Sequence, residues 1–514
     1  MSREFELKLR LGPKQFKRMA ELFGARAVAK PTTRRLKSVY FDTPDHGLAT
    51  RRVALRVRYD GERRVQTIKT ESGDRQGYAR GEWERELVGD QPELSDLPKA
   101  GEASSLLSGA AVQERLEPVF ETDFERSEWL VDLGEGTEVV CTLDQGEVRS
   151  GSKRSAIREA ELELKTGRAA DVFDLARCLH RDAPFRMEPR SKAAVGYALR
   201  AFTPAPPKFA APDLDTAETA EAATKRIAGA CISYLRAHQG RLMDREDPLA
   251  IHQMRVASRR LRSLLQLLRS RTPPALAEIA AELRWFAQRL APARDWDVFL
   301  SETLAPVRES LPGDASLEVL AARANEARER AYRRARRALD TRRFTALLLD
   351  VGYWIELEDW SAPDKKERTA SLNMPVSDVA RPLLNRLWLA ARDGGHDLTL
   401  LDRRALHALR IRIKKLRYAS EFFASLFPNG DAKPLLRLLR RLQDHLGHIQ
   451  DVTATAALLE GLAPKKKKKN KKDARAIERA AGIIAGWQAS AERATRTQLA
   501  RAWAEFEAQG PFWS

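Results

Sequence analysis

The sequence predicts two domains of different fold class, an α+β domain followed by an all-α helical bundle with an internal duplication. Three observations predict this. Before residue 203, charged and apolar residues alternate with the period of β-strands. After residue 216, the apolar residues follow the period of helices. A proline-rich segment separates the two regions.

Six segments of the first region alternate and are expected to form strands, at 5–11, 54–59, 65–69, 83–88, 138–144 and 160–165. Helices are expected at about 13–24 and 169–181. Successive side chains of a strand point to opposite faces, so Glu4, Glu6 and Lys8 share one face. Charged residues at every second position recur in Arg56 and Arg58, in Glu82 and Glu84, and in Glu159, Glu161, Glu163 and Lys165.

These charged faces fit two arrangements. An antiparallel sheet with one face in water would display them to solvent. A closed barrel would instead gather carboxylates and basic groups in one interior. That interior would suit a metal–polyphosphate complex, because hard divalent cations take carboxylate oxygens and phosphates take Arg and Lys.

A linker is expected at 204–216, where four prolines fall between Pro204 and Pro212. Proline at this density prevents helix propagation. The domains are therefore expected at 1–203 and 217–510, the second with repeats at about 217–360 and 375–510. Its helices are expected to break at Pro248, Pro273, Pro312, Pro363, Gly394, Pro428 and Gly461.

One helix of the second domain has a basic stripe and is duplicated. His252, Arg255, Arg259 and Arg262 follow offsets 0, 3, 7 and 10, which places them on one side of a helix. The same spacing returns 155 residues later in His407, Arg410, Lys414 and Arg417. Arg294-Asp295 and Gln450-Asp451 follow the two copies. A single basic helix is usually a solvated face, but matched copies predict two stripes across one groove.

Charge separates the two regions as well. Residues 1–203 hold 36 Lys and Arg against 34 Asp and Glu, whereas residues 204–514 hold 54 against 38. The second region therefore predicts a polyanionic partner, and sign alone leaves nucleic acid, polyphosphate and acidic membranes open. The run from Lys465 to Lys472 is expected to be a solvated loop between helices.

The first region resembles the CYTH superfamily, the triphosphate tunnel metalloenzymes. Seven of that family's landmarks occur in family order: Glu4-x-Glu6-x-Lys8, Tyr40-Phe41-Asp42-Thr43, Leu55-Arg56-x-Arg58, Lys69, Leu143-Asp144-x-Gly146, Glu161-Leu162-Glu163-Leu164-Lys165 and Ser191-Lys192. The resemblance implies an eight-stranded antiparallel β-tunnel that hydrolyses a triphosphate with Mg²⁺ or Mn²⁺.

The resemblance also implies roles for individual residues. The metal-binding carboxylates would be Glu4, Glu6, Asp144, Glu161 and Glu163. The phosphates would be held by Arg56, Arg58, Lys69, Arg126 and Lys192. Lys8 would contact the substrate or orient the attacking water, in a catalytic group with Glu4 and Glu6. Glu82 and Glu84 are second choices, because outward ion pairs explain them equally well, and Tyr40, Phe41 and Asp42 are expected to be structural.

The second region resembles the CHAD domain over about 217–510, through its two histidine-bearing helices and the segment LQDHLGHIQD. The resemblance implies that the two basic stripes bind inorganic polyphosphate. Few aromatic residues accompany the stripes, so nucleic acid is the less favoured partner.

The leading hypothesis is a metal-dependent inorganic triphosphatase fused to a polyphosphate-binding domain. The same tunnel could serve thiamine or nucleoside triphosphates, or adenylate cyclisation, and the chain could also be a mainly non-catalytic protein that targets polyphosphate granules. Cys141, Cys178 and Cys231 are scattered, and no run of about 18 apolar residues occurs. We therefore expect a cytoplasmic protein that has no membrane partner. Association with polyphosphate granules is a further expectation.

Overall fold

The computed structural model describes residues 2–70, 79–94, 107, 110–206, 208–268, 275–357, 372–396, 398–462 and 471–513. The lysine run falls outside this part from Lys465 through residue 470. The chain forms two compact units. The first comprises residues 1–209, 232–244 and 339–359, and the second comprises residues 210–231, 245–338 and 360–514.

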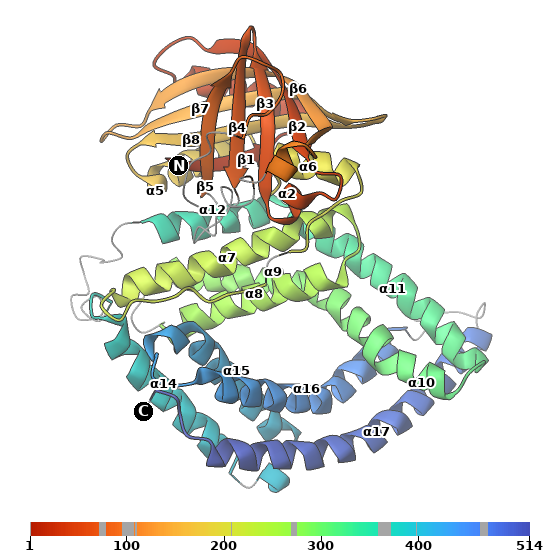
Figure 1. Ribbon diagram of the computed structural model, residues 1–514. Coiled ribbons are helices and arrows are strands. Elements are labelled where there is room, and N and C mark those ends of the chain that lie inside the picture. The colour runs from red at the N-terminus through yellow and green to blue at the C-terminus, as the bar shows by residue number, and fades with distance from the viewer. Residues whose placement is uncertain are drawn as a thin grey trace. The chain divides into compact units, whose positions relative to one another are not determined.

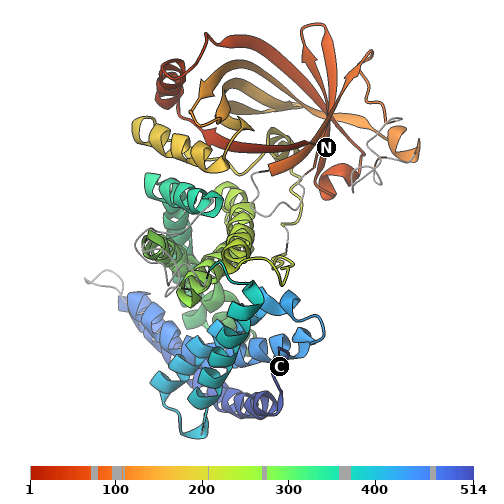
Figure 2. The same cartoon turned by 90° about the vertical axis from the view of Figure 1, so that its left-hand side faces the viewer.

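The first unit is built on antiparallel strands, which Figures 1 and 2 show wrapping around a common interior. The strands are β1 (Ser2–Arg10), β2 (Thr32–Asp42), β3 (Val53–Asp60), β4 (Arg63–Thr70), β5 (Ala79–Leu87), β6 (Glu117–Asp132), β7 (Glu138–Ser150), β8 (Lys153–Thr166) and β9 (Arg186–Met187). Its helices are α1 (Pro13–Gly24), α2 (Gly47–Thr50), α4 (Ala110–Gln113), α5 (Ala169–Asp182), α6 (Lys192–Leu199) and α12 (Arg342–Glu356), together with residues 232–244 of α7 (Ala220–Asp244).

The sheet closes on itself through β1. Its order is β5-β4-β3-β2-β6-β7-β8-β1-β9, and β1 also pairs with β5. The first half of β1 pairs with β5, and its second half pairs with β8 on one side and β9 on the other. The long strands therefore form the closed eight-stranded tunnel that was predicted. The two-residue β9 is a ninth strand that the prediction did not include.

The landmark around Asp42 has a structural role, as predicted. The buried Asp42 carboxylate accepts hydrogen bonds from the backbone N–H groups of Thr43, Leu48 and Ala49, which fixes the short helix α2. It also accepts one from the hydroxyl of Tyr197 at 2.8 Å, which ties α6 to β2. Asp42 thus joins three elements at one end of the tunnel.

The second unit is helical, which confirms the predicted all-α class. Its helices are residues 220–231 of α7, α8 (Pro248–Leu267), α9 (Ala275–Val298), α10 (Ala305–Ser310), α11 (Ala315–Leu339), α14 (Val376–Gly394), α15 (Arg403–Phe423), α16 (Ala432–Leu462) and α17 (Lys471–Ala508), with the π-helix η1 (Phe299–Leu304) and the short 3-10 helices η2 (Leu398–Leu400) and η3 (Ala424–Leu426). Most predicted breaks coincide with helix ends, as at Pro248, Gly394 and Gly461. The breaks predicted at Pro273 and Pro363 lie outside the described residues.

The duplication extends to the way the two basic helices begin. Asp247 caps α8 by accepting a hydrogen bond from the backbone N–H of Ala250 at 2.9 Å. Asp402, which lies 155 residues later, caps α15 by accepting one from Ala405 at 2.7 Å. Because an aspartate at this position satisfies an N–H that the helix leaves open, both copies start in the same register.

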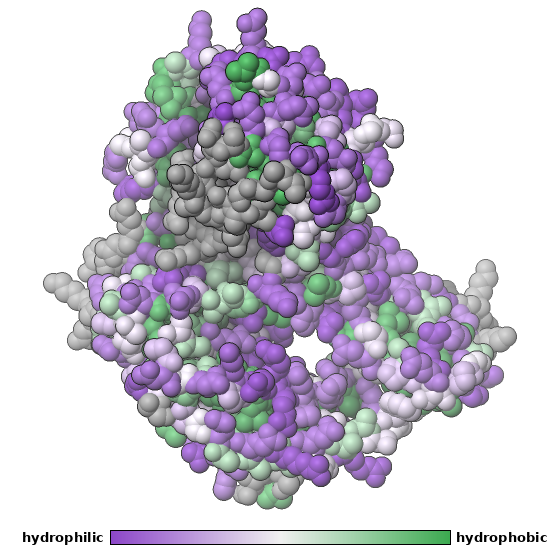
Figure 3. Space-filling view, viewed as in Figure 1, coloured by the Kyte–Doolittle hydropathy of each residue, from purple (hydrophilic) through white to green (hydrophobic). Residues whose placement is uncertain are grey.

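The face of the molecule in Figure 3 is dominated by hydrophilic residues. The same view shows an opening within the helical unit, where Figure 1 draws the space between the α8–α9 and α15–α16 pairs. Among the described residues, no helix combines the length and apolar character needed to cross a membrane.

Candidate functional site

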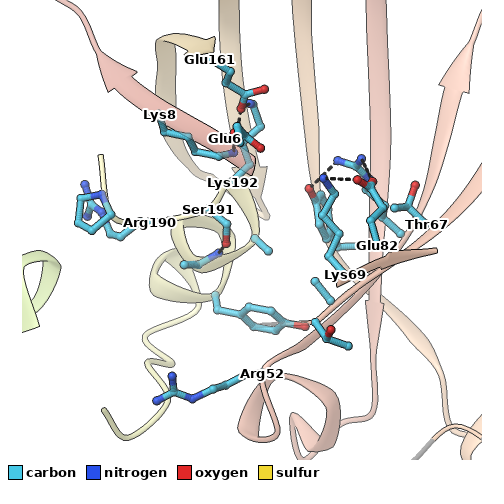
Figure 4. A pocket seen from close by; sticks show the side chains of 18 of the residues that line it. Glu6, Lys8, Arg52, Thr67, Lys69, Glu82, Glu161, Arg190, Ser191 and Lys192 are labelled. Atoms are coloured by element: carbon cyan, nitrogen blue, oxygen red, sulfur yellow. Dashed lines mark hydrogen bonds and ion pairs between the residues drawn. The ribbon is translucent and has the colours of Figure 1, made fainter. Parts of the chain in front are cut away.

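Strand register brings the charged landmarks together inside the tunnel. Lys8 of β1 lies opposite Glu161 of β8, and Glu6 lies opposite Glu163. Across the tunnel, Lys69 of β4 pairs in register with Glu82 of β5. Inward-facing residues of these strands line one cavity of about 680 Å³ (Figure 4). The alternative of a sheet with one face in water is therefore wrong.

Three carboxylates form what we call the acid cluster: Asp144, Glu159 and Glu161. Each offers an oxygen, and these oxygens lie within 4.8 Å of one another. The three residues are 0, 9 and 7% exposed. Hard divalent cations take several carboxylate oxygens in such a group, so the donor set fits Mg²⁺ or Mn²⁺. The cluster reaches the cavity through Glu161.

Basic side chains bind the acid cluster from several elements. Lys192 Nζ lies 2.7 Å from Asp144 and 2.9 Å from Glu161, and it also pairs with Glu159. Arg126 donates two hydrogen bonds to the Asp144 carboxylate, from Nε at 2.7 Å and from Nη2 at 2.6 Å. Nη2 also donates to Glu161 at 2.6 Å. Lys8 Nζ lies 2.8 Å from Glu161 and 3.1 Å from Glu6. The cluster is therefore neutralised by its own surroundings.

Helix α6 places Lys192 at this position. The Ser191 hydroxyl caps α6 by accepting a hydrogen bond from the N–H of Ala194 at 3.1 Å, so the helix begins at Lys192. The ammonium group is thereby held in the tunnel, where its side chain is 7% exposed. The Ser191-Lys192 landmark thus combines a helix cap with a buried charge.

Burial and neighbouring charges shift the pKa values in opposite directions. Burial works against the charged Lys192, yet Asp144, Glu159 and Glu161 raise its pKa well above the usual value. Burial also opposes ionisation of Glu161, but Lys192, Lys8 and Arg126 hold its pKa well below the usual range. For Glu159, burial dominates and raises the pKa. Such divergent shifts among neighbouring groups are typical of functional sites.

The opposite wall of the cavity is basic and includes Arg56, Arg58 and Lys69, which we call the basic wall. Arg56 donates to the hydroxyl of Tyr40 at 3.4 Å. Burial, together with the nearby Arg56 and Arg126, lowers the pKa of Arg58 to about 10. Crowded buried cations of this kind are stabilised when an anion enters between them.

Two carboxylates lie within the basic wall. Lys69 Nζ is 3.0 Å from Glu82, and Glu84 accepts a hydrogen bond from Thr67 at 3.0 Å. Both Glu82 and Glu84, the second choices among the candidate carboxylates, line the cavity. Figure 4 shows Lys69 and Glu82 across the cavity from Lys8 and Glu161.

The structure brings nearly all the candidate tunnel residues into one site. Those that line the cavity are Glu6, Lys8, Arg56, Arg58, Lys69, Arg126, Glu161, Glu163 and Lys192, and Asp144 lies in the acid cluster. Glu4 belongs to β1, but its side chain lies outside the described part. Sequence reasoning did not assign Glu159 to the metal, although it alternates with Glu161 and Glu163.

The second unit brings the two basic stripes together at α8 and α15. Burial, with the charges of Arg410, Arg259 and Arg417, lowers the pKa of Lys414 to about 7. Arg259 belongs to α8 and the other residues to α15, so cations of both copies face one another. Burial likewise lowers the pKa of Arg410. These cations repel one another and are partly removed from water, so a bound polyanion would stabilise their charged forms.

The two copies also carry matching carboxylates. Asp295 lies near Arg255 in the first copy, and Asp451 lies near Arg410 in the second. Burial raises the pKa of both carboxyl groups. The copies differ at Gln450, which stands where the first copy has Arg294 and accepts hydrogen bonds from His407 at 2.8 Å and Arg410 at 3.2 Å.

The other stripe residues are less uniform. Burial and then Arg294, Arg259 and Arg255 lower the pKa of His252 to about 4. Arg417 is buried and forms an ion pair with Glu421 at 3.0 Å, which also binds Arg260. The Nε atoms of Arg259, Arg262, Arg410 and Arg417 are buried and have no hydrogen-bond partner among the described residues. Arg417 differs in that its guanidinium is partly neutralised by Glu421.

Comparison with known proteins agrees with this division. A CYTH domain model matches residues 2–197, and a CHAD domain model matches residues 226–460. An inorganic triphosphatase from Haemophilus influenzae is 30% identical over 201 residues, which cover 39% of this chain and 55% of that protein. The match therefore spans about half of the relative's length.

Solved structures resemble each part. The CHAD domain of the plant Ricinus communis is 28% identical and covers 57% of this chain and 96% of its own, with a TM-score of 0.48. A protein from Pyrococcus horikoshii is 20% identical and covers 39% and 99%, with a TM-score of 0.27. With the family matches and the geometry together, residues 2–197 form a CYTH domain and residues 226–460 form a CHAD domain.

Proposed function

We propose that the tunnel hydrolyses inorganic triphosphate to pyrophosphate and phosphate with Mg²⁺ or Mn²⁺. The observation that carries this proposal is the pairing, in one cavity, of the acid cluster with the basic wall. Carboxylates alone would repel a triphosphate, and cations alone would not hold a metal. The name of the Haemophilus relative supports the choice of substrate.

In this proposal the acid cluster, together with Glu4, Glu6 and Glu163, holds the metal. A bound divalent cation would neutralise phosphate charge and lower the pKa of a water molecule. Arg56, Arg58 and Lys69 bind the phosphate oxygens and the leaving pyrophosphate, with Arg126 and Lys192 at the opposite side. Because these groups already line the cavity, they stabilise the charge of the transition state without a large rearrangement.

Lys8 acts between the two sets of groups. Its ammonium nitrogen lies between Glu6 and Glu161, and burial is outweighed by these carboxylates, which raise its pKa. Lys8 therefore stays protonated and donates hydrogen bonds to the terminal phosphate or to the attacking water. The water oxygen bonds to the terminal phosphorus, the bond to pyrophosphate breaks, and the water proton leaves with the products.

A substrate panel tests this proposal. Purified protein would be assayed with Mg²⁺, with Mn²⁺ and with chelator against inorganic triphosphate, thiamine triphosphate and ATP. The proposal expects metal-dependent phosphate release that is fastest with inorganic triphosphate. Faster release from either organic triphosphate, or formation of cyclic AMP, would move the assignment to an alternative substrate of the same tunnel.

We also propose that the CHAD domain binds inorganic polyphosphate through the two basic stripes. The facing cations of α8 and α15, and the lowered pKa of Lys414, support this role. Competition between polyphosphate and RNA at fixed salt tests it, since preference for RNA would reverse the assignment. With Cys141, Cys178 and Cys231 all free, we place the protein in the cytoplasm, where thiols stay reduced, with polyphosphate granules as a candidate location.

A further inference from the structure

One face of α7 forms part of the tunnel cavity. The helix residues that line it fall at offsets 0, 3, 4, 7, 8 and 11, which is the spacing of a single helical face. They are Ser233, Arg236, Ala237, Gly240, Arg241 and Asp244, which we call the α7 wall. All belong to the first compact unit, although they follow the linker in sequence.

Specific contacts hold the α7 wall against the strand domain. Asp244 accepts a hydrogen bond from Arg190 at 2.7 Å, and Arg190 is itself bound to Glu188 at 3.0 Å. Gly240 allows the close approach, because a Cβ there would lie 3.2 Å from the Arg190 side chain. Gln239 adds a hydrogen bond to the backbone of Met187 at 3.5 Å. The wall is thus a fixed part of the cavity.

The wall adds positive charge to the cavity from an element other than β7 and β8, the strands that carry the acid cluster. Arg236 is buried, with 9% of its surface exposed, and Arg241 is half-buried. Arg52 lines the same cavity, donates to the Ala205 carbonyl at 3.1 Å, and lies apart from Glu6 and Glu161 in Figure 4. The carboxylate of the wall, Asp244, is bound to Arg190. Among the α7 wall residues there are thus two arginines and one carboxylate.

We infer that Arg236 and Arg241 of the α7 wall bind the end of the phosphate chain that does not react. This inference rests on the proposed function for its substrate class. The acid cluster, carried by β7 and β8, would hold the metal beside the scissile bond, whereas the α7 wall belongs to a separate element of the same cavity, so we assign its contact to the other end of the phosphate chain. Such a contact strengthens the ground state and the transition state equally, which lowers KM and leaves kcat unchanged.

The inference gives α7 a role that the CYTH match does not include. That match ends at residue 197, whereas Arg236 and Arg241 lie within the residues matched by the CHAD model. The helical part of the chain thus supplies specificity residues to the tunnel. An arginine offers several donors in a fixed fork, which suits the oxygens of consecutive phosphates.

The test compares Arg236→Gln, Arg241→Gln and the double variant with Arg18→Gln. Arg18 is a matched control, because it is an exposed arginine of the same unit on α1. The double variant is expected to raise KM for inorganic triphosphate about tenfold, with kcat within about twofold of wild type. Arg236→Lys should have a KM between those of wild type and Arg236→Gln, since lysine keeps the positive charge but lacks the planar set of donors of a guanidinium group.

A binding measurement separates this inference from the proposed function. Calorimetry with inorganic triphosphate and chelator requires no turnover, and the double variant should raise Kd about tenfold. If wild type binds but does not hydrolyse triphosphate, the same rise supports the α7 contact while the triphosphatase proposal fails. If wild type hydrolyses triphosphate and the double variant keeps its KM and Kd, the inference is wrong. A loss confined to kcat also contradicts it. Should Arg236→Gln fail to fold, Arg241→Gln alone decides by the same criteria.

Discussion

The ammonium nitrogen of Lys192 lies 2.7 Å from a carboxylate oxygen of Asp144, and the Asp144 side chain is completely buried. The same nitrogen contacts the other two members of the acid cluster. A divalent cation held by these oxygens would therefore compete with Lys192. Charge balance in the tunnel thus couples the position of this lysine to metal binding.

We predict that Lys192→Gln destabilises the fold and strengthens its response to metal. Removing one partner of a buried ion group leaves carboxylates uncompensated, at a cost of about 3 kcal/mol. Mn²⁺ should then raise the Tm of the variant more than that of wild type, because no ammonium competes. Thermal unfolding with and without Mn²⁺ measures both effects. If Mn²⁺ raised the Tm of the two proteins by the same amount, Lys192 would not be competing with the metal for the carboxylates.

We predict that polyphosphate binding by the CHAD domain weakens as pH rises through 7. Burial, with Arg410, Arg259 and Arg417, lowers the pKa of Lys414 to about 7. Below this pH the lysine is charged and attracts the polyanion, and above it the neutral amine does not. Titrations of polyphosphate between pH 6 and 8.5 measure the change. Lys414→Arg should flatten the profile, and an unchanged slope in that variant would contradict this role.

We predict that Arg259→Gln reduces the salt dependence of polyphosphate binding. Each phosphate contact that releases a counterion contributes about one unit to the slope of log K against log salt. Arg412→Gln is the matched control, because this exposed arginine of α15 lies away from the basic stripe. Binding is measured at several salt concentrations. If the slope of log K against log salt were the same for wild type and Arg259→Gln, Arg259 would not contact the bound phosphates.

We predict that Gly146→Ala destabilises the tunnel by about 1–3 kcal/mol. A Cβ at Gly146 would lie 2.1 Å from the backbone oxygen of Asp123, so β6 and β7 would have to separate beside Asp144. Gly89→Ala is the control, since a Cβ there meets nothing within 4 Å. Urea unfolding measures the free-energy difference. Equal stability of the two variants would show that the strands yield without cost.

Sequence periodicity predicted six of the tunnel strands but missed β2 and β6. In β6, charged residues occupy both faces: Glu121, Asp123 and Glu125 lie outside, while Arg126 faces Asp144 in the tunnel. A tunnel lined by charge thus weakens the apolar alternation on which strand prediction depends. The first residues of β2 are exposed and show little alternation.

Sequence order also limited the prediction of the site. The CYTH landmarks led to the residues of the acid cluster and the basic wall, except that Glu159 was not assigned to the metal. Arg236 and Arg241 could not be connected with the tunnel, because they follow the predicted linker and α7 reads as an ordinary helix. Only the folded chain places one face of α7 in the cavity. The predicted linker at 204–216 stays a prediction.

The most direct test is phosphate release from inorganic triphosphate at increasing Mn²⁺ or Mg²⁺, for wild type, Glu161→Gln and Glu125→Gln. Glu125 is the matched control, because it is exposed on the outer face of β6 beside the inward-facing Arg126. We expect metal-dependent release by wild type and Glu125→Gln, and at least about a hundredfold loss in Glu161→Gln. Metal-independent release, or full activity in Glu161→Gln, would contradict catalysis in the tunnel.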